Sequence, residues 1–301
     1  MSIELSAKNE QVVSSPPTGW QVIWREFKKD KVAMFSLIAL VIVIVGVFIW
    51  AWFFIDQEAL MEISLRDRYA APGSEFFLGA DQGGRDILGQ LIIGARNSIS
   101  IAIGITLITG IFGIMIGLIC GYFGGWIDNM FMRIIDFFIT IPSLMLIIVF
   151  ITVIPKYTVL EFVLIMSLFL WTGTARLIRS KALSESRRDY VNASKTLGTN
   201  DSVIIFNGVM PNLSSILIVE LTLNFAGNVG IETGLSYLGF GLPPSTPSLG
   251  TLVSYANNPL VLYQYWWCWL PAALFILFMM LGINYVGQAL RRAADAKQRL
   301  G

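Results

Sequence analysis

Residues 99–123, ISIAIGITLITGIFGIMIGLICGYF, decide the fold of this chain of 301 residues. The longer stretch from Asn97 to Ile127 contains no charged side chain. About 20 consecutive apolar residues in a helix are enough to cross the ~30 Å hydrocarbon core of a membrane. The stretch therefore predicts a membrane-spanning helix, and it argues against a soluble globular protein.

Apolar blocks of similar length recur along the chain. Hydrophobic residues make up 55% of it and charged residues 14%, whereas roughly a quarter of the residues of soluble proteins are charged. We therefore expect an all-α polytopic membrane protein with six transmembrane helices, at about 33–55, 99–123, 134–154, 158–175, 212–235 and 266–287. The expected organisation is a tail over 1–32, the first span over 33–55, an outer loop over 56–97, a five-helix core over 98–290 and a second tail over 291–301.

Positive charge is distributed unevenly between the expected loops. Sixteen of the lysines and arginines fall in segments on one side of the membrane and five on the other. Loops rich in lysine and arginine stay in the cytoplasm. Both termini, and the loop that follows the fourth span, are therefore expected to be cytoplasmic.

The tail before the first span contains apolar residues at helical spacing. Basic residues lie between them, which is typical of an amphipathic helix in the membrane interface. Simple extension of the first span into the headgroups is the alternative. The apolar positions are Trp20, Ile23, Trp24 and Phe27.

Several classes of protein are excluded by what the chain lacks. It has no histidine, and its two cysteines, Cys120 and Cys268, lie in or beside apolar spans, so no metal site is expected. The net charge of +1 gives no reason to expect a nucleic-acid partner. The sequence has no Gly-Lys pair, and hence no phosphate-binding loop of an ATPase. We also find no nucleophile–base pattern of an enzyme.

A stripe of glycines follows one face of the second span. Gly113, Gly117, Gly121 and Gly125 recur at every fourth residue. Small residues at this spacing let the backbone of a neighbouring helix approach closely in a membrane. The neighbour is either another helix of this chain or a helix of a second subunit.

Two glutamates in the fifth span are candidates for a translocation path. Glu220 lies eight residues past Asn212, where the span is expected to begin, and is thus about 12 Å deep at roughly 1.5 Å per residue. A charge there is unfavourable against lipid, so it is expected to face an interface or a cavity. A hydrogen-bonded structural glutamate is the alternative. Glu232 is expected near the outer surface, within reach of water.

The loop after the fourth span, residues 182–210, contains the segment DYVNASKTLG at 189–198. Its first part has helical periodicity, and Gly198 is suited to end a helix. Asp201 or Ser202 is expected to cap a second short helix, and Pro211 to break the chain before the fifth span. The prediction is a compact helix–turn–helix on the cytoplasmic side, and an ordinary solvated loop is the alternative.

This segment resembles the hallmark of permeases of ATP-binding-cassette importers, which is a Glu-Ala-Ala run followed by a glycine and then a proline at fixed spacing. Ala193, Gly198 and Pro211 match in type and spacing. Asn192 stands in place of the glutamate and Ser194 in place of the second alanine. The resemblance implies that Asp189, Tyr190 and these five residues couple the chain to an ATPase subunit.

More of the chain is similar to one branch, the second-subunit permeases for oligopeptides, dipeptides and nickel. The matching residues run in family order from about 20 to 295. They include Leu78–Asp81 with Gly84–Asp86, Gly94–Arg96, Gly121–Asp128 with Arg133 and Asp136, Glu232 with Leu235–Gly241, Pro243, Pro244, Pro247–Gly250, Trp266, Trp267, Pro271, Asn284, Leu290 and Arg291.

The resemblance implies one half of a transmembrane pathway for peptides in the plasma membrane of a prokaryote. The implied partners are a second homologous permease, two ATP-binding-cassette ATPase subunits, an extracellular substrate-binding protein and membrane lipid. ATP would be bound by those partners, and this chain would carry no cofactor of its own. Nickel or another small solute is the alternative cargo, and a self-sufficient channel or secondary transporter is the alternative class.

Overall fold

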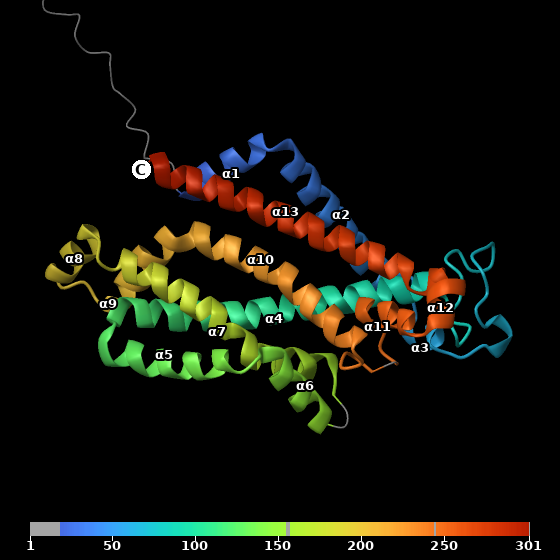
Figure 1. The fold of residues 1–301 in the computed structure, drawn as a ribbon. Helices are drawn as coiled ribbons and strands as arrows, with labels where there is room; N and C mark the ends of the chain where they lie inside the picture. The colour runs from blue at the N-terminus through green and yellow to red at the C-terminus, as the bar shows by residue number, and fades with distance from the viewer. Residues whose placement is uncertain (1–18, 155–156, 244, 301) are drawn as a thin grey trace, which may run out of the picture.

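The computed structural model describes residues 19–154, 157–243 and 245–300, and this part of the chain is almost entirely helical (Figure 1). Residues 1–18 of the first tail and the expected turn at Pro155 and Lys156 lie outside it. The α-helices are α1 (Gly19–Lys29), α2 (Lys31–Phe53), α3 (Gln57–Leu60), α4 (Ile87–Phe123), α5 (Gly125–Thr140), α6 (Ser143–Val153), α7 (Val159–Glu185), α8 (Asp189–Thr196), α9 (Asp201–Val203), α10 (Met210–Tyr237), α11 (Leu249–Ser254), α12 (Pro259–Gln264) and α13 (Leu270–Leu300). Shorter helical turns cover Leu65–Asp67, Ile204–Val209, Tyr255–Asn257 and Trp266–Cys268.

The all-α membrane fold is confirmed. Among the described residues, five helical segments are long and apolar enough to cross a membrane, and the bent pair α5–α6 makes a sixth if it counts as one span. The five segments are Lys31–Phe53, Ile87–Phe123, Val159–Glu185, Asp201–Tyr237 and Leu270–Ala294.

The third expected span, 134–154, is wrong as a single straight helix. Helix α5 begins at Gly125, and the axes of α5 and α6 differ by 78° across Ile141 and Pro142. Proline has no N–H to donate, and it disfavours helical dihedrals in the residue before it. Ile141 is accordingly extended, with φ −98° and ψ 128°.

Other expected boundaries also shift. Helix α4 begins at Ile87 rather than at residue 99, because the Asp86 carboxylate caps it by accepting hydrogen bonds from the N–H groups of Leu88 and Gly89. The loop expected over 56–97 therefore ends where α4 starts. Helix α7 runs on to Glu185, and α13 starts at Leu270, after the Trp266–Cys268 turn.

The glycine stripe lies against α7 of the same chain. A Cβ atom on Gly117 would be 2.8 Å from the Ala175 carbonyl oxygen, and one on Gly121 would be 2.6 Å from the Ala182 Cβ. Gly113 approaches Thr174 in the same way. Gly125 differs from these three, because it starts α5 with a φ of +58° and has no neighbour within 4 Å of the Cβ position.

Helix α1 is present, but its apolar face packs on protein. Phe27 is 1% exposed and belongs to a cluster that includes Leu290 and Ala293 of α13. Trp24 stacks on Phe27, with ring centres 5.7 Å apart. The expectation that this face lies in the lipid interface is thus wrong for Phe27, whereas Trp24 is half-buried. The side chains of Trp20 and Ile23 lie outside the described residues.

The two ends of the molecule differ. Helix α1, helix α8 and the C-terminal part of α13 lie at one end, and α3, α11 and α12 lie at the other (Figure 1). The Asp30 carboxylate and the Arg292 guanidinium, 2.8 Å apart, join the N-terminal and C-terminal segments at the first end. The described parts of the basic segments in α1, around α8 and at the end of α13 therefore lie at the same end of the molecule.

Candidate functional site

Helix α8 is held firmly against the ends of the spanning helices. Val191 is fully buried. The hydroxyl group of Tyr190 donates a 3.1 Å hydrogen bond to Glu185 at the end of α7, and Arg188 forms an ion pair of 3.0 Å with the same carboxylate. The apolar cluster around Val191 contains Leu118, Tyr122, Ile178, Ala182, Ile204, Ile205, Val209, Leu213 and Leu217. The buried face of α8 thus belongs to one apolar cluster with residues of α4, α7 and α10.

The opposite face of α8 is open. Asp189, Asn192 and Ala193 are exposed, and Ser194 is half-buried because its hydroxyl bonds the Tyr190 carbonyl oxygen at 2.8 Å. Beyond the helix, the apolar side chain of Leu197 is 84% exposed. The five residues that the sequence singles out between 189 and 194 therefore lie on one short helix.

Gly198 ends this segment as expected, with a φ of +77° that glycine adopts readily. The cap of the next helix differs from the expectation. The Asn200 side chain, rather than that of Asp201 or Ser202, accepts a 3.0 Å hydrogen bond from the Ser202 N–H. Asp201 instead accepts a 2.6 Å hydrogen bond from the hydroxyl group of Tyr122 in α4.

Pro211 does not break the chain, which corrects the sequence prediction. Helical structure runs from Asp201 to Tyr237, and Pro211 lies in the first turn of α10. The turn before it, Ile204–Val209, is a π-helix. Proline has no N–H to donate, and it lies just after this turn, where the hydrogen bonding departs from the regular α-helical pattern: the Met210 N–H bonds the Ile205 carbonyl oxygen. The helix–turn–helix is therefore continuous with the fifth span.

Glu220 lines a cavity of about 350 Å³ between α7, α10 and α13. Its carboxylate accepts hydrogen bonds from Asn224 at 3.2 Å and from Thr174 at 3.5 Å. The cavity wall also includes Leu177, Lys181, Ile216, Val219, Leu223, Arg291 and Ala294. One acid thus faces a cavity with two cations in its wall.

Glu232 is not within reach of water, contrary to the expectation. Its side chain has no exposed surface, and its two oxygens accept hydrogen bonds from Ser98 at 2.8 Å and Ser236 at 2.9 Å. Ser98 in turn accepts a 3.0 Å bond from the N–H of Leu249. Glu232 therefore joins α4, α10 and α11, and contributes no surface to a solvent-filled path in this structure. Distance along the span indicates depth, but the neighbouring helices decide exposure.

A polar network at the end opposite α8 is missed by the sequence reasoning. Asp81 is 1% exposed, forms an ion pair of 2.7 Å with Arg85 and accepts a 3.0 Å hydrogen bond from Gln90. Tyr255 donates to the same carboxylate at 3.1 Å. Burial alone would raise the pKa of Asp81, but the bonds from Arg85 and Gln90 outweigh it and hold that pKa below its usual range. The spacing of Asp81 and Arg85 is visible in the sequence, whereas nothing in it indicates Tyr255.

Comparison with known proteins is consistent with this architecture. A family model described as the inner membrane component of binding-protein-dependent transport systems matches residues 113–300. A second model, the N-terminal transmembrane domain of oligopeptide transport permease C, matches residues 18–72.

Curated relatives match along almost the whole chain. The oligopeptide transport system permease protein OppC of Lactococcus lactis is 50% identical over 277 residues, which cover 92% of this chain and 94% of the relative. The protein of the same name from Bacillus subtilis is 33% identical, with 93% and 90% covered. The dipeptide transport system permease protein DppC of Bacillus subtilis is 32% identical, with 93% and 86% covered. The chain belongs to the family of inner membrane components of binding-protein-dependent transport systems.

Proposed function

We propose that this chain forms half of the transmembrane pathway of a peptide importer that separate ATPase subunits drive. The two matched relatives that carry the name OppC are oligopeptide permeases, and the third is a dipeptide permease. The partners in this proposal are a homologous permease, two ATP-binding-cassette ATPases and an extracellular binding protein.

The observation that carries the proposal is the position of α8. One of its faces is fixed to the ends of α4, α7 and α10 through Val191, and the other is exposed and followed by the apolar side chain of Leu197. A rigid element of this kind transmits force from a docked partner to the spanning helices. A loop without the buried contact would not do so.

We also propose an orientation for the chain in the membrane. The end that carries α8 also carries α1 and the basic part of α13 (Figure 1), and basic segments favour the cytoplasm. The ATPases would dock at this end, and both termini would be cytoplasmic. The binding protein would approach the end that carries α3, α11 and α12.

Glu220 is proposed to line the pathway. Its cavity lies among three spanning helices, and Lys181 and Arg291 in the wall supply the opposite charge. Replacing Glu220 with glutamine tests this role. Slower uptake of peptides by a stably folded variant is expected, and an unchanged rate for all peptides would remove Glu220 from the pathway.

The main test is uptake of a labelled oligopeptide by proteoliposomes that contain this chain, the partner permease and both ATPases, with the binding protein added outside. Uptake is expected to require ATP. Leu197→Asp is expected to abolish uptake and the co-purification of the ATPases, because a carboxylate replaces the apolar side chain at the docking surface. Thermal stability of the isolated chain should remain unchanged, since Leu197 makes no buried contact.

Leu65→Asp is the matched control for the co-purification of the ATPases. Leu65 and Leu197 are exposed to a similar extent, 75% and 84%. Leu65, however, lies in the segment before α4, at the other end of the molecule. Uptake of peptide without the ATPases would contradict the proposal. So would normal uptake by the Leu197→Asp variant.

A further inference from the structure

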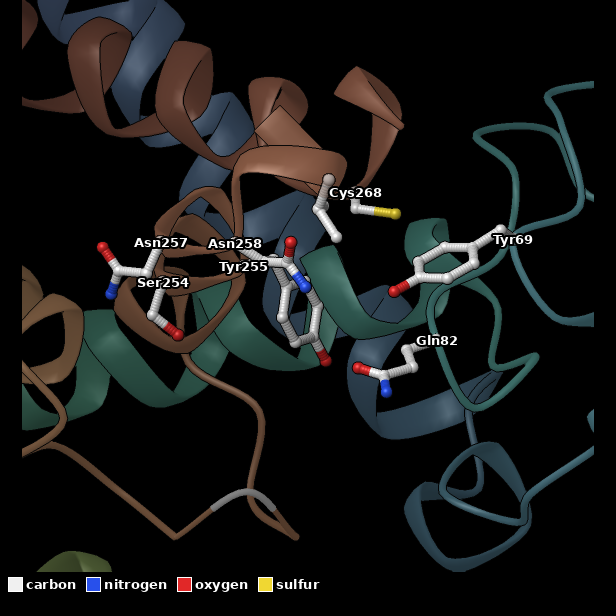
Figure 2. A pocket seen from close by; sticks show the side chains of 8 residues that line it. Tyr69, Gln82, Ser254, Tyr255, Asn257, Asn258 and Cys268 are labelled. Carbon is white, nitrogen blue, oxygen red and sulfur yellow. The ribbon is translucent and has the colours of Figure 1, made fainter. Parts of the chain in front are cut away.

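A polar pocket of about 480 Å³ (Figure 2) lies beside α11 and α12, at the end of the molecule opposite α8 (Figure 1). This volume falls within the range of about 300–1,000 Å³ that is usual for small-ligand sites. Two distant segments form the pocket, the loop before α4 and the region from α11 to the start of α13. Its wall consists of Tyr69, Gln82, Ser254, Tyr255, Asn257, Asn258, Val261 and Cys268.

The two sides of the pocket are joined by hydrogen bonds and by ring stacking. The Tyr255 hydroxyl is 3.1 Å from Asp81 and 3.4 Å from the Arg85 guanidinium, both in the segment before α4. The rings of Tyr69 and Tyr265 are parallel, with centres 4.0 Å apart. The pocket is therefore preformed, and a ligand would not have to order its walls.

Tyr69 adopts an unfavourable backbone conformation at the pocket wall. Its φ is +55°, and within the described ranges it is the only residue other than glycine with a positive φ. Such a conformation costs of order 1–3 kcal/mol, persists only where the surrounding structure enforces it and is frequent at ligand sites. Here it places the ring so that its hydroxyl points toward Tyr255 and Gln82 (Figure 2).

The chemistry of the wall is polar without charge. Amide groups of Gln82, Asn257 and Asn258 and hydroxyl groups of Ser254 and Tyr69 line it. Some of their atoms are engaged within the protein: Asn257 donates to the Tyr237 carbonyl oxygen, Asn258 accepts from the Leu260 N–H, and Ser254 donates to the Thr251 carbonyl oxygen. The other donors and acceptors of these groups remain for a ligand. The buried carboxylate of Asp81, which lies behind the wall, is engaged by Arg85. A ligand here meets hydrogen-bonding groups of both kinds, the complement of an amide N–H and C=O.

We propose that this pocket binds the main chain of an extended peptide segment at the outer end of the subunit. The inference rests on the proposed function, which places peptide and binding protein at this end. Val261 and Cys268 provide an apolar patch for one side chain of the segment. The same chemistry fits a peptide in transit and a loop of the substrate-binding protein, and the experiment distinguishes these two sources.

The variant combines Gln82→Ala with Tyr69→Phe, which removes an amide and a hydroxyl from the wall and retains the Tyr69 ring. The control combines Gln264→Ala with Tyr263→Phe, the same two changes at exposed positions outside the pocket. The assembled transporter is placed in nanodiscs. Binding is measured for an alanine tetrapeptide with an acetylated amino terminus and an amidated carboxyl terminus, and separately for the binding protein.

We expect the pocket variant to bind the capped tetrapeptide with about tenfold lower affinity, and the control to bind it with unchanged affinity. This result supports the pocket as a site for the transported peptide. The same loss seen only for the binding protein supports the pocket as a site for one of its loops. Equal affinities in the pocket variant and the control for both ligands overturn the inference, as does the absence of binding to the unaltered transporter. A melting temperature of the pocket variant close to that of the control shows that the variant retains its fold.

Failure here is separable from failure of the proposed function. If the unaltered transporter takes up peptide with ATP but the pocket variant binds both ligands normally, the pocket inference alone is wrong. If the unaltered transporter takes up no peptide, the proposed function is wrong.

Discussion

The hydroxyl group of Ser98 donates a hydrogen bond of 2.8 Å to the carboxylate of Glu232, although 134 residues separate the two in sequence. Both side chains are completely buried. Ser236 donates to the other carboxylate oxygen at 2.9 Å, so the acid satisfies two hydroxyl groups at once. In a membrane-spanning bundle this contact fixes α4 against α10 by polar geometry in addition to packing.

Glu232→Ala is expected to destabilise the chain by about 1–3 kcal/mol, because Ser98 and Ser236 would lose their buried acceptor. Glu232→Gln retains an acceptor oxygen and should cost less. The measurement is thermal unfolding in detergent, with Glu58→Ala at an exposed position of the short helix α3 as the control. Equal stability of the Ala and Gln variants would show that the hydrogen bonds do not hold these helices.

Asp128 and Arg179 form the ion pair that should matter most for the α5–α7 contact. Asp128 is 8% exposed, and both of its oxygens accept from the Arg179 guanidinium, one of them at 2.8 Å. Asp128→Ala is expected to cost about 2 kcal/mol, since it leaves a guanidinium without its bidentate partner.

The matched control is Asp136→Ala, which breaks the neighbouring pair with Arg176. Those two side chains are 55% and 49% exposed, and exposed pairs contribute about 0–1 kcal/mol. Chemical denaturation of the two variants should therefore differ clearly. An equal loss of stability would contradict the assignment.

Gly117→Ala is expected to lower stability although alanine favours helices. The new methyl group would lie 2.8 Å from the Ala175 carbonyl oxygen, a backbone atom that can move only with its helix. Overpacking of this kind costs about 1–3 kcal/mol. Gly173→Ala on α7 makes the same change with no neighbour within 4 Å, and should be neutral or stabilising. A comparison of the two melting temperatures tests the close contact of α4 and α7.

The Asp81–Arg85 pair predicts acid sensitivity of the segment before α4. Burial disfavours the ionised form of Asp81 and so raises its pKa. The bonds from Arg85 and Gln90 stabilise the ionised form more strongly, so the pKa in the folded protein lies below the usual 3.8. The pair's contribution to stability is therefore complete above about pH 4 to 5 and is lost as the pH falls through the folded pKa.

Asp81→Asn should accordingly destabilise the loop at pH 7. The stability of the variant loop should then no longer decrease as the pH falls below about 4, because the group that takes up the proton is gone. Hydrogen exchange of residues 64–86 as a function of pH measures this directly. Glu75→Gln, in the exposed part of the same loop, is the control. A wild-type profile in the Asp81→Asn variant would assign the acid response to another group.

The all-α membrane fold, the short helix at 189–196 and the grouping of basic residues at one end could all be predicted from the sequence. Each of these depends on local properties: hydropathy over about 20 residues, helical spacing and a glycine at position 198. Such signals act within a few turns of chain and need no knowledge of the neighbouring helices. Even the bend at Pro142 has a local cause, although the length of the apolar block outweighed it in the prediction.

Which acid faces a cavity and which is buried could not be predicted without the packing of the helices. Glu220 and Glu232 lie on one helix, yet the first lines a cavity beside Lys181 and the second is sealed by Ser98. The packing of Tyr255 against Asp81 likewise joins residues 174 positions apart. The physical reason is that burial and hydrogen bonding depend on which helices become neighbours, and the pattern along one helix does not specify its partners.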